Sequence, residues 1–176
     1  MLARQALDSP EALQELCGLF IASIFNYVLR RVGGVADAED ITSTVFEKVI
    51  GNLKSFDPAK ASFKTWIYRI ALNCITDFYR ARGRKREQPL DEQTAGIPGS
   101  QGELERLELF MTLAGLMRAL PKKQQEAVTL RYFGGMSVIE VAQVLGVTET
   151  AVSKRILRGL DALRKNAGGT RLEEMV

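Results

Sequence analysis

The segment from Ser137 to Arg158, SVIEVAQVLGVTETAVSKRILR, constrains the fold of this chain more than any other segment. Its opening serine is followed three residues later by Glu140, a capping-box sequence that begins a helix. Gly146 can adopt a positive φ, which ends that helix and lets the chain turn. Thr148 is expected to cap a second helix, and two apolar residues four apart face that helix inward: Val152 and Ile156. The segment predicts a helix-turn-helix.

The outward face of the second predicted helix begins with short polar residues and continues with cations. Its members are Thr148, Glu149, Thr150, Ser153, Lys154, Arg155 and Arg158. This order suits a helix that enters a DNA major groove, where cations reach phosphates or a guanine edge. The alternative is an ordinary helical hairpin with a basic solvated face. The cap, the turn glycine, the small Ala142 and the basic face agree with one another, and together they favour DNA binding.

Charge is distributed in three blocks, although the 176 residues carry a net charge of only +3. Residues 1–86 hold 13 Lys/Arg and 9 Asp/Glu, residues 87–105 hold 5 Asp/Glu and no Lys/Arg, and residues 106–176 hold 11 Lys/Arg and 7 Asp/Glu. Two basic blocks on either side of an acidic connector are typical of two nucleic-acid-facing modules on a tether.

Helical periodicity dominates and strand signals are scarce, so we expect an all-α protein with two small helical domains joined by a flexible acidic linker. The connector contains Pro89, Pro98, Gly96 and Gly99 and lacks a hydrophobic period. The predicted boundaries are residues 9–86 for the first domain, 87–103 for the linker, 104–167 for the helix-turn-helix domain and 168–176 for a tail.

The first domain is predicted to contain three helices. Ser9 and Pro10 supply a cap and an N1 proline for the first, which the Gly33-Gly34 pair ends. Acidic residues load the first turn of the second helix, and residues 51–61 form a loop. Ser62 caps the third helix, whose expected core stripe is Phe63, Trp66 or Ile67, Ile70, Cys74 and Phe78.

Cations, aromatics and an amide are interleaved along this third helix. The end of the helix holds five cations in seven residues: Arg80, Arg82, Arg84, Lys85 and Arg86. Upstream on the same helix stand Lys64, Tyr68, Arg69, Asn73, Asp77 and Tyr79. Such a face suits a nucleic acid with partly unstacked bases, because cations hold phosphates and rings accept bases. A solvated basic helix end is the alternative, but the helix-turn-helix on the same chain favours DNA. Trp66 is interpreted as a core residue in preference to a wedge against a base pair.

Enzyme and metal chemistry have little support in the sequence, which contains no histidine. Asp37, Glu39 and Asp40 lie within four residues at a helix start, where capping and protein docking are favoured over a divalent-metal site. We therefore expect no cofactor and no metal. The two cysteines, Cys17 and Cys74, are expected to be buried free thiols. We also expect no membrane insertion, because no apolar run looks long enough, and a cytoplasmic location.

Several segments together resemble the extracytoplasmic-function sigma factors of bacterial RNA polymerase. ADAEDITSTVFEKVI is similar to the polymerase-docking helix of that family, and SFKTWIYRIALNCITDFYRARGRK to its promoter-melting helix. LPKKQQEAVTLRYFGGMSVIEVAQVLGVTETAVSKRILRGLDALRK is similar to its fourth region. The resemblance runs from about Leu19 to Lys165 in the family's order and spacing.

The resemblance implies a non-enzymatic initiation factor whose partners are the polymerase core, promoter DNA and an anti-sigma factor. Docking on the clamp coiled coil of the largest subunit would use Asp37, Asp40, Ile41, Thr44 and Glu47. Proximal-element binding and melting would use Asn52, Lys54, Ser55, Phe56, Ser62, Lys64, Trp66, Tyr68, Arg69, Asn73, Asp77, Arg80 and Arg84. The second domain would contact the flap and read the distal element with the recognition face given above, while the linker would thread toward the active centre.

Ser153, Glu149 and Thr150 depart from residues common in the family's recognition helix, so the sequence leaves the promoter unspecified. Two other functions compete with the sigma-factor interpretation. One is a stand-alone helix-turn-helix regulator with a sensor domain, which would not need the aromatic and basic third helix. The other is a magnesium-dependent nucleic-acid enzyme built on Asp37, Glu39 and Asp40.

Overall fold

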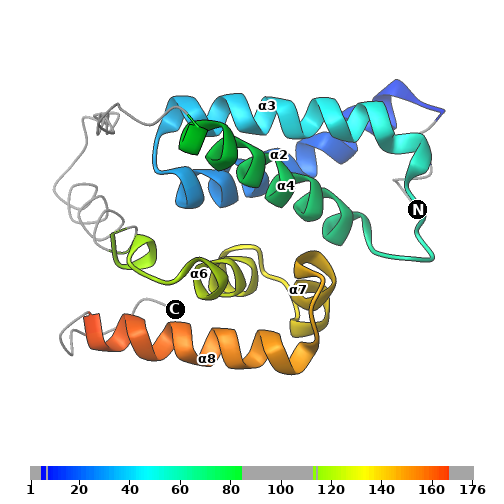
Figure 1. The fold of residues 1–176 in the computed structure, drawn as a ribbon. Coiled ribbons are helices and arrows are strands. Elements are labelled where there is room, and N and C mark those ends of the chain that lie inside the picture. The colour runs from blue at the N-terminus through cyan, green and yellow to red at the C-terminus, as the bar shows by residue number, and fades with distance from the viewer. Residues whose placement is uncertain (1–4, 7, 85–112, 114, 167–176) are drawn as a thin grey trace, which may run out of the picture. The chain divides into compact units, whose positions relative to one another are not determined.

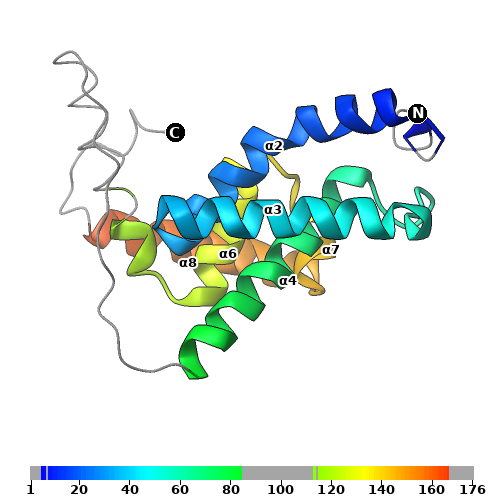
Figure 2. The same ribbon diagram turned by 90° about the horizontal axis from the view of Figure 1, so that it is seen from above.

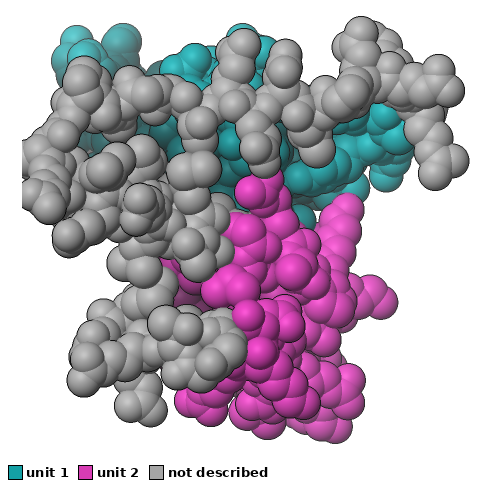
Figure 3. Space-filling model, turned by 90° about the vertical axis from the view of Figure 1, so that its left-hand side faces the viewer, with its two compact units in different colours: residues 1–93, 143–145 teal, residues 94–142, 146–176 magenta. Residues whose placement is uncertain are grey.

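The computed structural model describes residues 5, 6, 8–84, 113 and 115–166. The chain forms two compact units, residues 1–93 with 143–145 and residues 94–142 with 146–176 (Figure 3). Helix α7 is described with the second unit because most of it belongs there. The predicted linker (87–103) and tail (168–176) lie outside the described residues. The residues that the structure describes form helices and the turns between them, and contain no strand, as the sequence predicts.

The first helix of unit 1, α2 (Pro10–Val32), begins and ends at the predicted residues. Ser9 is its N-cap, and the Ser9 hydroxyl accepts a hydrogen bond of 3.2 Å from the amide of Ala12. Pro10 occupies the first turn, where the amide hydrogen that proline lacks would have no helical partner. Gly33 ends the helix with φ 83°, a conformation that glycine adopts without steric cost.

Two further helices complete unit 1. Helix α3 (Val35–Asn52) is followed by a short 3-10 turn, η1 (Leu53–Ser55), so helical structure reaches further into the predicted 51–61 loop than expected. Helix α4 (Phe63–Arg84) follows Ser62, whose hydroxyl accepts a 3.1 Å hydrogen bond from the amide of Thr65. Helix α3 packs against both α2 and α4, and α4 crosses α3 obliquely (Figures 1 and 2).

The core of unit 1 is formed by fully buried aliphatic residues from all three helices: Ile24, Val28, Val45, Val49, Ile67, Ala71 and Ile75. The predicted α4 stripe was correct for Cys74 and for Ile67, the second of the two alternatives at that point, since both are buried. It was wrong in part, because Trp66, Ile70 and Phe78 are only half-buried. One residue corresponds to about 100° around a helix. The stripe that faces α2 and α3 is therefore rotated by one residue from the expected one.

Helix α2 corrects the expectation that no apolar run is long enough to span a membrane. Its most apolar stretch has a mean hydropathy of 1.5, so by length and composition the helix is long and apolar enough to cross a membrane. A single such helix is weak evidence for a span, since core helices of soluble proteins pass too. In this chain α2 packs against α3 and α4 and contributes Ile24 and Val28 to the core.

Unit 2 contains α6 (Lys122–Val128), the π-helical turn η2 (Thr129–Phe133), α7 (Val138–Leu145) and α8 (Glu149–Asn166). Residues 115–118 are also helical, and the remainder of the helix predicted for 104–120 lies largely outside the described residues. The core cluster joins α6 to α8 and to the preceding helical turn through Met117, Leu120, Val128 and Leu163. This packing fixes α6 and α8, the helices that carry Lys122, Lys123, Arg155 and Arg158.

Candidate nucleic-acid interface

The predicted helix-turn-helix is present as α7, a turn and α8. The Ser137 hydroxyl accepts from the Glu140 amide at 3.2 Å, and the Glu140 carboxylate accepts from the Ser137 amide at 2.8 Å, which completes a capping box. Gly146 ends α7 with φ 64°. The Thr148 hydroxyl then caps α8 by accepting from the Ala151 amide at 3.2 Å. Local sequence signals thus set both ends of the turn.

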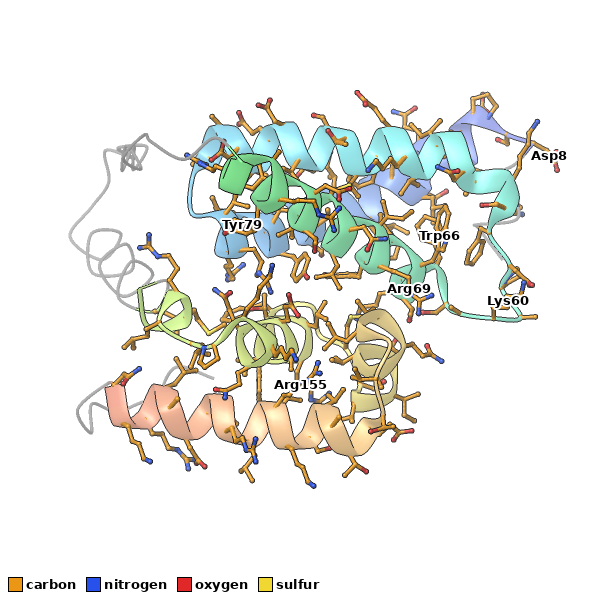
Figure 4. All side chains as sticks on the ribbon, in the orientation of Figure 1. Asp8, Lys60, Trp66, Arg69, Tyr79 and Arg155 are labelled. Carbon is orange, nitrogen blue, oxygen red and sulfur yellow. The ribbon has the colours of Figure 1, made fainter. Side chains whose placement is uncertain are left out.

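Helix α8 separates an apolar face from a polar one as predicted. Val152, Ile156 and Leu163 are buried. The polar residues of the predicted recognition face are exposed, except for Arg155, which is half-buried (Figure 4): Thr148, Glu149, Thr150, Ser153, Lys154 and Arg158. Arg155 also lines a hollow on the surface of unit 2.

That hollow, of about 320 Å³, lies between the beginning of α6 and the second and third turns of α8. It is lined by Pro121, Lys122, Lys123, Gln124, Arg155 and Arg158. Four cations from two helices therefore surround one concave surface, which we call the cationic hollow. Its α8 residues were predicted, but Lys122 and Lys123 were missed. Two adjacent lysines directly after Leu120-Pro121 were the signal that could have identified them.

Unit 1 has a second hollow, of about 280 Å³, where α3 and η1 meet α4. Its lining residues are Lys48, Asn52, Ser55, Trp66, Ile70 and Asn73. The sequence predicted Asn52, Ser55, Trp66 and Asn73 as proximal-element residues, and the structure brings these four together. Lys48 and Ile70 were missed as lining residues, because one lies on the predicted docking helix and the other was assigned to the core. We call this the amide hollow.

The chemistry of the amide hollow matches what an extruded base requires. An indole and an aliphatic side chain offer surfaces for stacking, while amides and a hydroxyl offer hydrogen bonds to a base edge. Asn52 donates to the carbonyl of Lys48 at 2.8 Å, and Ser55 donates to the carbonyl of Asn52 at 2.7 Å. The exposed amide of Asn73 has no hydrogen-bond partner within the described part of the chain. It is therefore the amide with both donors and acceptor available.

Trp66, which lies on α4 (Figure 4), belongs to an aromatic cluster and lines the amide hollow. Its ring centroid lies 5.3 Å from that of Phe56 and 5.5 Å from that of Phe63. It also packs against the buried cluster formed by Ala6, Leu16 and Leu53. The half-buried tryptophan therefore packs against the edge of the core and also lines the amide hollow.

The other proximal-element residues differ in accessibility. Lys54, Ser62, Arg69, Asp77 and Arg80 are exposed and Lys64 is half-buried. Asp77 and Arg80 form an ion pair of 3.1 Å with side chains that are 57% and 64% exposed. An ion pair this exposed is worth little in water, so a phosphate can displace the carboxylate from the arginine. The side chain of Arg84 lies outside the described residues.

Tyr68 was wrongly predicted to face nucleic acid. Its side chain is 1% exposed, and its ring packs edge-on against Tyr27 with the ring centroids 5.2 Å apart. The one-residue rotation of the α4 stripe places this position in the core. Burial raises the pKa of Tyr68 to about 12, and the charge of Arg30 partly offsets that rise.

Tyr68→Phe is expected to remove part of the loss of stability at high pH. An unfolded tyrosine has a pKa of about 10. As pH rises between about 10 and 12, the unfolded chain loses this proton before the folded protein does, which lowers the free energy of unfolding. Urea unfolding at pH 7 and pH 11 measures the effect, expected to be on the order of 1 kcal/mol. Tyr132→Phe, at a 42% exposed tyrosine, is the control. Loss of promoter opening at pH 7 with unchanged stability would contradict the core assignment.

The predicted docking residues on α3 fall into three groups. Asp40 and Glu47 are exposed and Thr44 is half-buried, and their spacing places all three on one face. Ile41 is only 6% exposed, so its assignment to the docking surface was wrong, because it faces the core instead. The carboxylate of Asp37 forms a 2.7 Å ion pair with Arg82 of α4, so its charge is already paired within unit 1.

A metal centre has no support in the described part of the chain, which contains no group of three or more His, Cys, Asp or Glu able to hold an ion. Both cysteines are free; Cys74 is buried and Cys17 is half-buried. Burial raises the pKa of each thiol, and Lys48 partly offsets the rise at Cys74.

Comparison with known proteins gives two family matches, one in each unit. Residues 20–85 match the family described as Sigma-70 region 2, and residues 110–163 match Sigma-70, region 4. The ECF RNA polymerase sigma factor SigW of Bacillus subtilis (strain 168) is 33% identical over an alignment of 168 positions, and the match covers 88% of this chain and 88% of that protein.

Two solved structures have the same fold. CnrH, solved with the cytosolic domain of CnrY, is 26% identical with a TM-score of 0.76 and covers 96% of both chains. The sigma factor RpoE of Bartonella quintana, solved with the anti-sigma factor NepR, has a TM-score of 0.77 at 20% identity, over 90% of this chain and 98% of that one. The matches to both regions and the identity to SigW agree with the two helical units and the helix-turn-helix. The chain therefore belongs to the sigma-70 family, as an extracytoplasmic-function (ECF) sigma factor of RNA polymerase.

Proposed function

We propose that the two units divide the work of transcription initiation between them. The first, residues 9–86, docks on the polymerase core and holds promoter DNA open. The second, residues 104–167, contacts the flap and binds the distal promoter element as duplex, and residues 87–103 link the two. The protein acts in the cytoplasm, where polymerase and promoters are found, and it contributes binding energy instead of catalysis.

The observation that carries this proposal is the amide hollow. It combines stacking surfaces with base-edge hydrogen-bonding groups at one point of a basic helix. Unstacking a base costs a few kcal/mol per step. Stacking on an aromatic side chain returns about 1–3 kcal/mol per base. The two magnitudes are comparable, so the hollow can hold an open promoter only with the help of polymerase contacts.

The second unit supplies affinity for duplex DNA. The four cations of the cationic hollow suit two adjacent phosphates of one strand, and the exposed residues at the start of α8 suit base edges in the major groove. The exposed Thr148, Glu149, Thr150 and Ser153 are our proposed reading residues. Arg155 and Arg158, with the newly identified Lys122 and Lys123, are our proposed phosphate contacts.

Polymerase docking is assigned to the exposed face of α3 that carries Asp40, Thr44 and Glu47. An acidic helix face of this kind suits a basic partner surface. We also propose an anti-sigma factor as a partner, supported by RpoE of Bartonella quintana, which was solved with one. Such a protein would cover the docking face and the DNA-facing surfaces, and would thereby keep the factor from the polymerase.

Purified protein mixed with bacterial core RNA polymerase is expected to form a stoichiometric complex on size exclusion. That complex should start transcripts from a promoter selected from a randomised library. Asp40→Ala should weaken the complex by about 2 kcal/mol if the carboxylate is buried against a cation. Glu39→Ala removes an exposed neighbouring carboxylate and is the matched control. Equal affinity of the wild type and Asp40→Ala would remove Asp40 from the docking face. Absence of a complex, with tight duplex binding by the protein alone, would favour the stand-alone regulator.

A further inference from the structure

Gly159 lies where α8 packs against α6. A Cβ atom built at this residue would lie 2.7 Å from Cγ2 of Val128, a separation that real Cβ atoms essentially never show. It would also lie 3.5 Å from Cβ of Gln124 and 3.8 Å from its carbonyl oxygen, both ordinary contacts. The absence of a side chain at Gly159 is therefore what allows the two helices to come this close.

Val128 is a buried core residue whose side chain is packed on several sides. It is 2% exposed and belongs to the core cluster of Met117, Leu120 and Leu163. Its branched side chain has one strongly preferred χ1 rotamer in a helix. A methyl group on residue 159 is therefore accommodated by separating the helices and not by turning the valine.

The cationic hollow lies beside this contact on both helices. Arg158 immediately precedes Gly159, and Arg155 lies one turn before it on α8. On α6, Gln124 both touches the missing Cβ position and lines the hollow, directly after the two lysines. A change in helix separation at Gly159 therefore changes the distance between the α8 arginines and the α6 lysines.

Glycine in a helix interior is unfavourable compared with alanine, because the backbone loses more freedom on folding. Helix propensity does not account for the residue, whereas the contact with Val128 does. We propose that Gly159 is a positioning residue, whose missing side chain sets the separation of α6 and α8 and hence the width of a cationic hollow that receives promoter phosphates. The inference rests on the proposed function of the second unit.

The test uses the full-length protein, assembled with core polymerase, and four variants: Gly159→Ala, Val128→Ala, the double variant, and Gly115→Ala. Gly115 is the matched control, because it also lies in a helical segment of unit 2 but a Cβ there would meet nothing within 4 Å. The probes are a duplex selected by the wild-type holoenzyme and an unrelated duplex of equal length. Affinity is measured over a range of salt concentrations, and thermal unfolding reports folding.

Gly159→Ala is expected to lower the affinity for both duplexes about tenfold and to flatten the slope of log K against log salt by about 1, since phosphate contacts set that slope. Val128→Ala in the same chain should restore both quantities, while Gly115→Ala should match the wild type. Restoration of the salt slope distinguishes helix spacing from a general loss of stability, which would lower the active fraction without changing the slope.

Three results would overturn the inference. One is a Gly159→Ala variant with wild-type affinity and slope. Another is a folded double variant that binds as weakly as the single one. The third applies if Gly159→Ala fails to fold: the double variant then also fails to fold. Removing the Val128 side chain would not have relieved the clash, so contact with Val128 would not be what opposes the added methyl group. If selection with the wild-type holoenzyme yielded no duplex that it binds, the proposed function would be overturned, and this inference with it.

Discussion

Trp66→Ala is expected to reduce transcription from a fully duplex promoter by about tenfold or more, while binding to the distal element stays unchanged. The substitution removes the stacking surface of the amide hollow, and a stacked base is worth about 1–3 kcal/mol. Transcripts from duplex templates and permanganate reactivity of unpaired thymines measure the effect. Distal binding is preserved because it is assigned to the other unit.

The same substitution also costs stability, since Trp66 packs against Phe56 and Phe63. Removing a large aromatic from a packed cluster costs on the order of 3 kcal/mol, less where the ring is partly exposed. Phe63→Leu separates the two effects, because Phe63 belongs to the aromatic cluster but does not line the hollow. Asn73→Ala removes a hydrogen-bonding group of the hollow and leaves the aromatic packing intact. Its exposed side-chain amide lines the hollow and has no hydrogen-bond partner in the described part of the chain. If Phe63→Leu lowered transcription as much as Trp66→Ala and Asn73→Ala had no effect, aromatic packing and not base binding would explain the loss.

The helix ends that carry a cap or a turn glycine were predictable because adjacent residues determine them. The caps at Ser9, Ser137 and Thr148 involve groups within three residues, and the chain reversals at Gly33 and Gly146 need only a backbone that tolerates positive φ. Interactions between residues this close in the sequence are determined by the local sequence. They do not depend on which other helices the helix packs against.

The orientation of each helix about its axis was harder to predict, because it depends on distant partners. The sequence of α4 offers two apolar stripes one residue apart, and contact with α2 and α3 selects the one that buries Ile67 and Tyr68. From the sequence alone, Tyr68 was interpreted as an aromatic residue that contacts nucleic acid. Its core position depends on contact with Tyr27, which lies 41 positions earlier in the sequence.

The two hollows show the same limitation. Four lining residues of the amide hollow were predicted as binding residues, but Lys48 joins them only because α3 packs against α4. Lys122 and Lys123 precede the arginines of α8 by more than 30 positions and reach them only through the packing of α6 against α8. Side chains from separate helices converge only through tertiary packing. The hydrophobic periodicity of one helix does not show which other helix it will pack against.

The double substitution Arg155→Ala and Arg158→Ala is expected to weaken binding of the holoenzyme to all duplexes by a similar factor. It removes two of the four cations of the cationic hollow. Each phosphate contact contributes about 0.9 to the slope of log K against log salt, so the slope should flatten by nearly 2. A phosphate contact carries no sequence information, so the loss of affinity should be uniform across sequences. Because the half-buried Arg155 faces a concave cluster of cations, we assign it to phosphates instead of a guanine edge, which leaves sequence recognition to the residues at the start of α8.

Arg164→Ala with Lys165→Ala provides the control, since it removes the same charge from the exposed last turn of α8, away from the hollow. If simple charge neutralisation governed binding, the two double variants would behave alike; the hollow predicts a much smaller effect for the control. Arg155→Lys tests geometry, because lysine keeps the charge and loses the planar fork that a base edge requires. A large loss confined to the selected duplex, with an unchanged salt slope, would contradict the phosphate assignment. It would instead identify Arg155 as a base-reading residue, which is the other role that its position on the recognition helix allows.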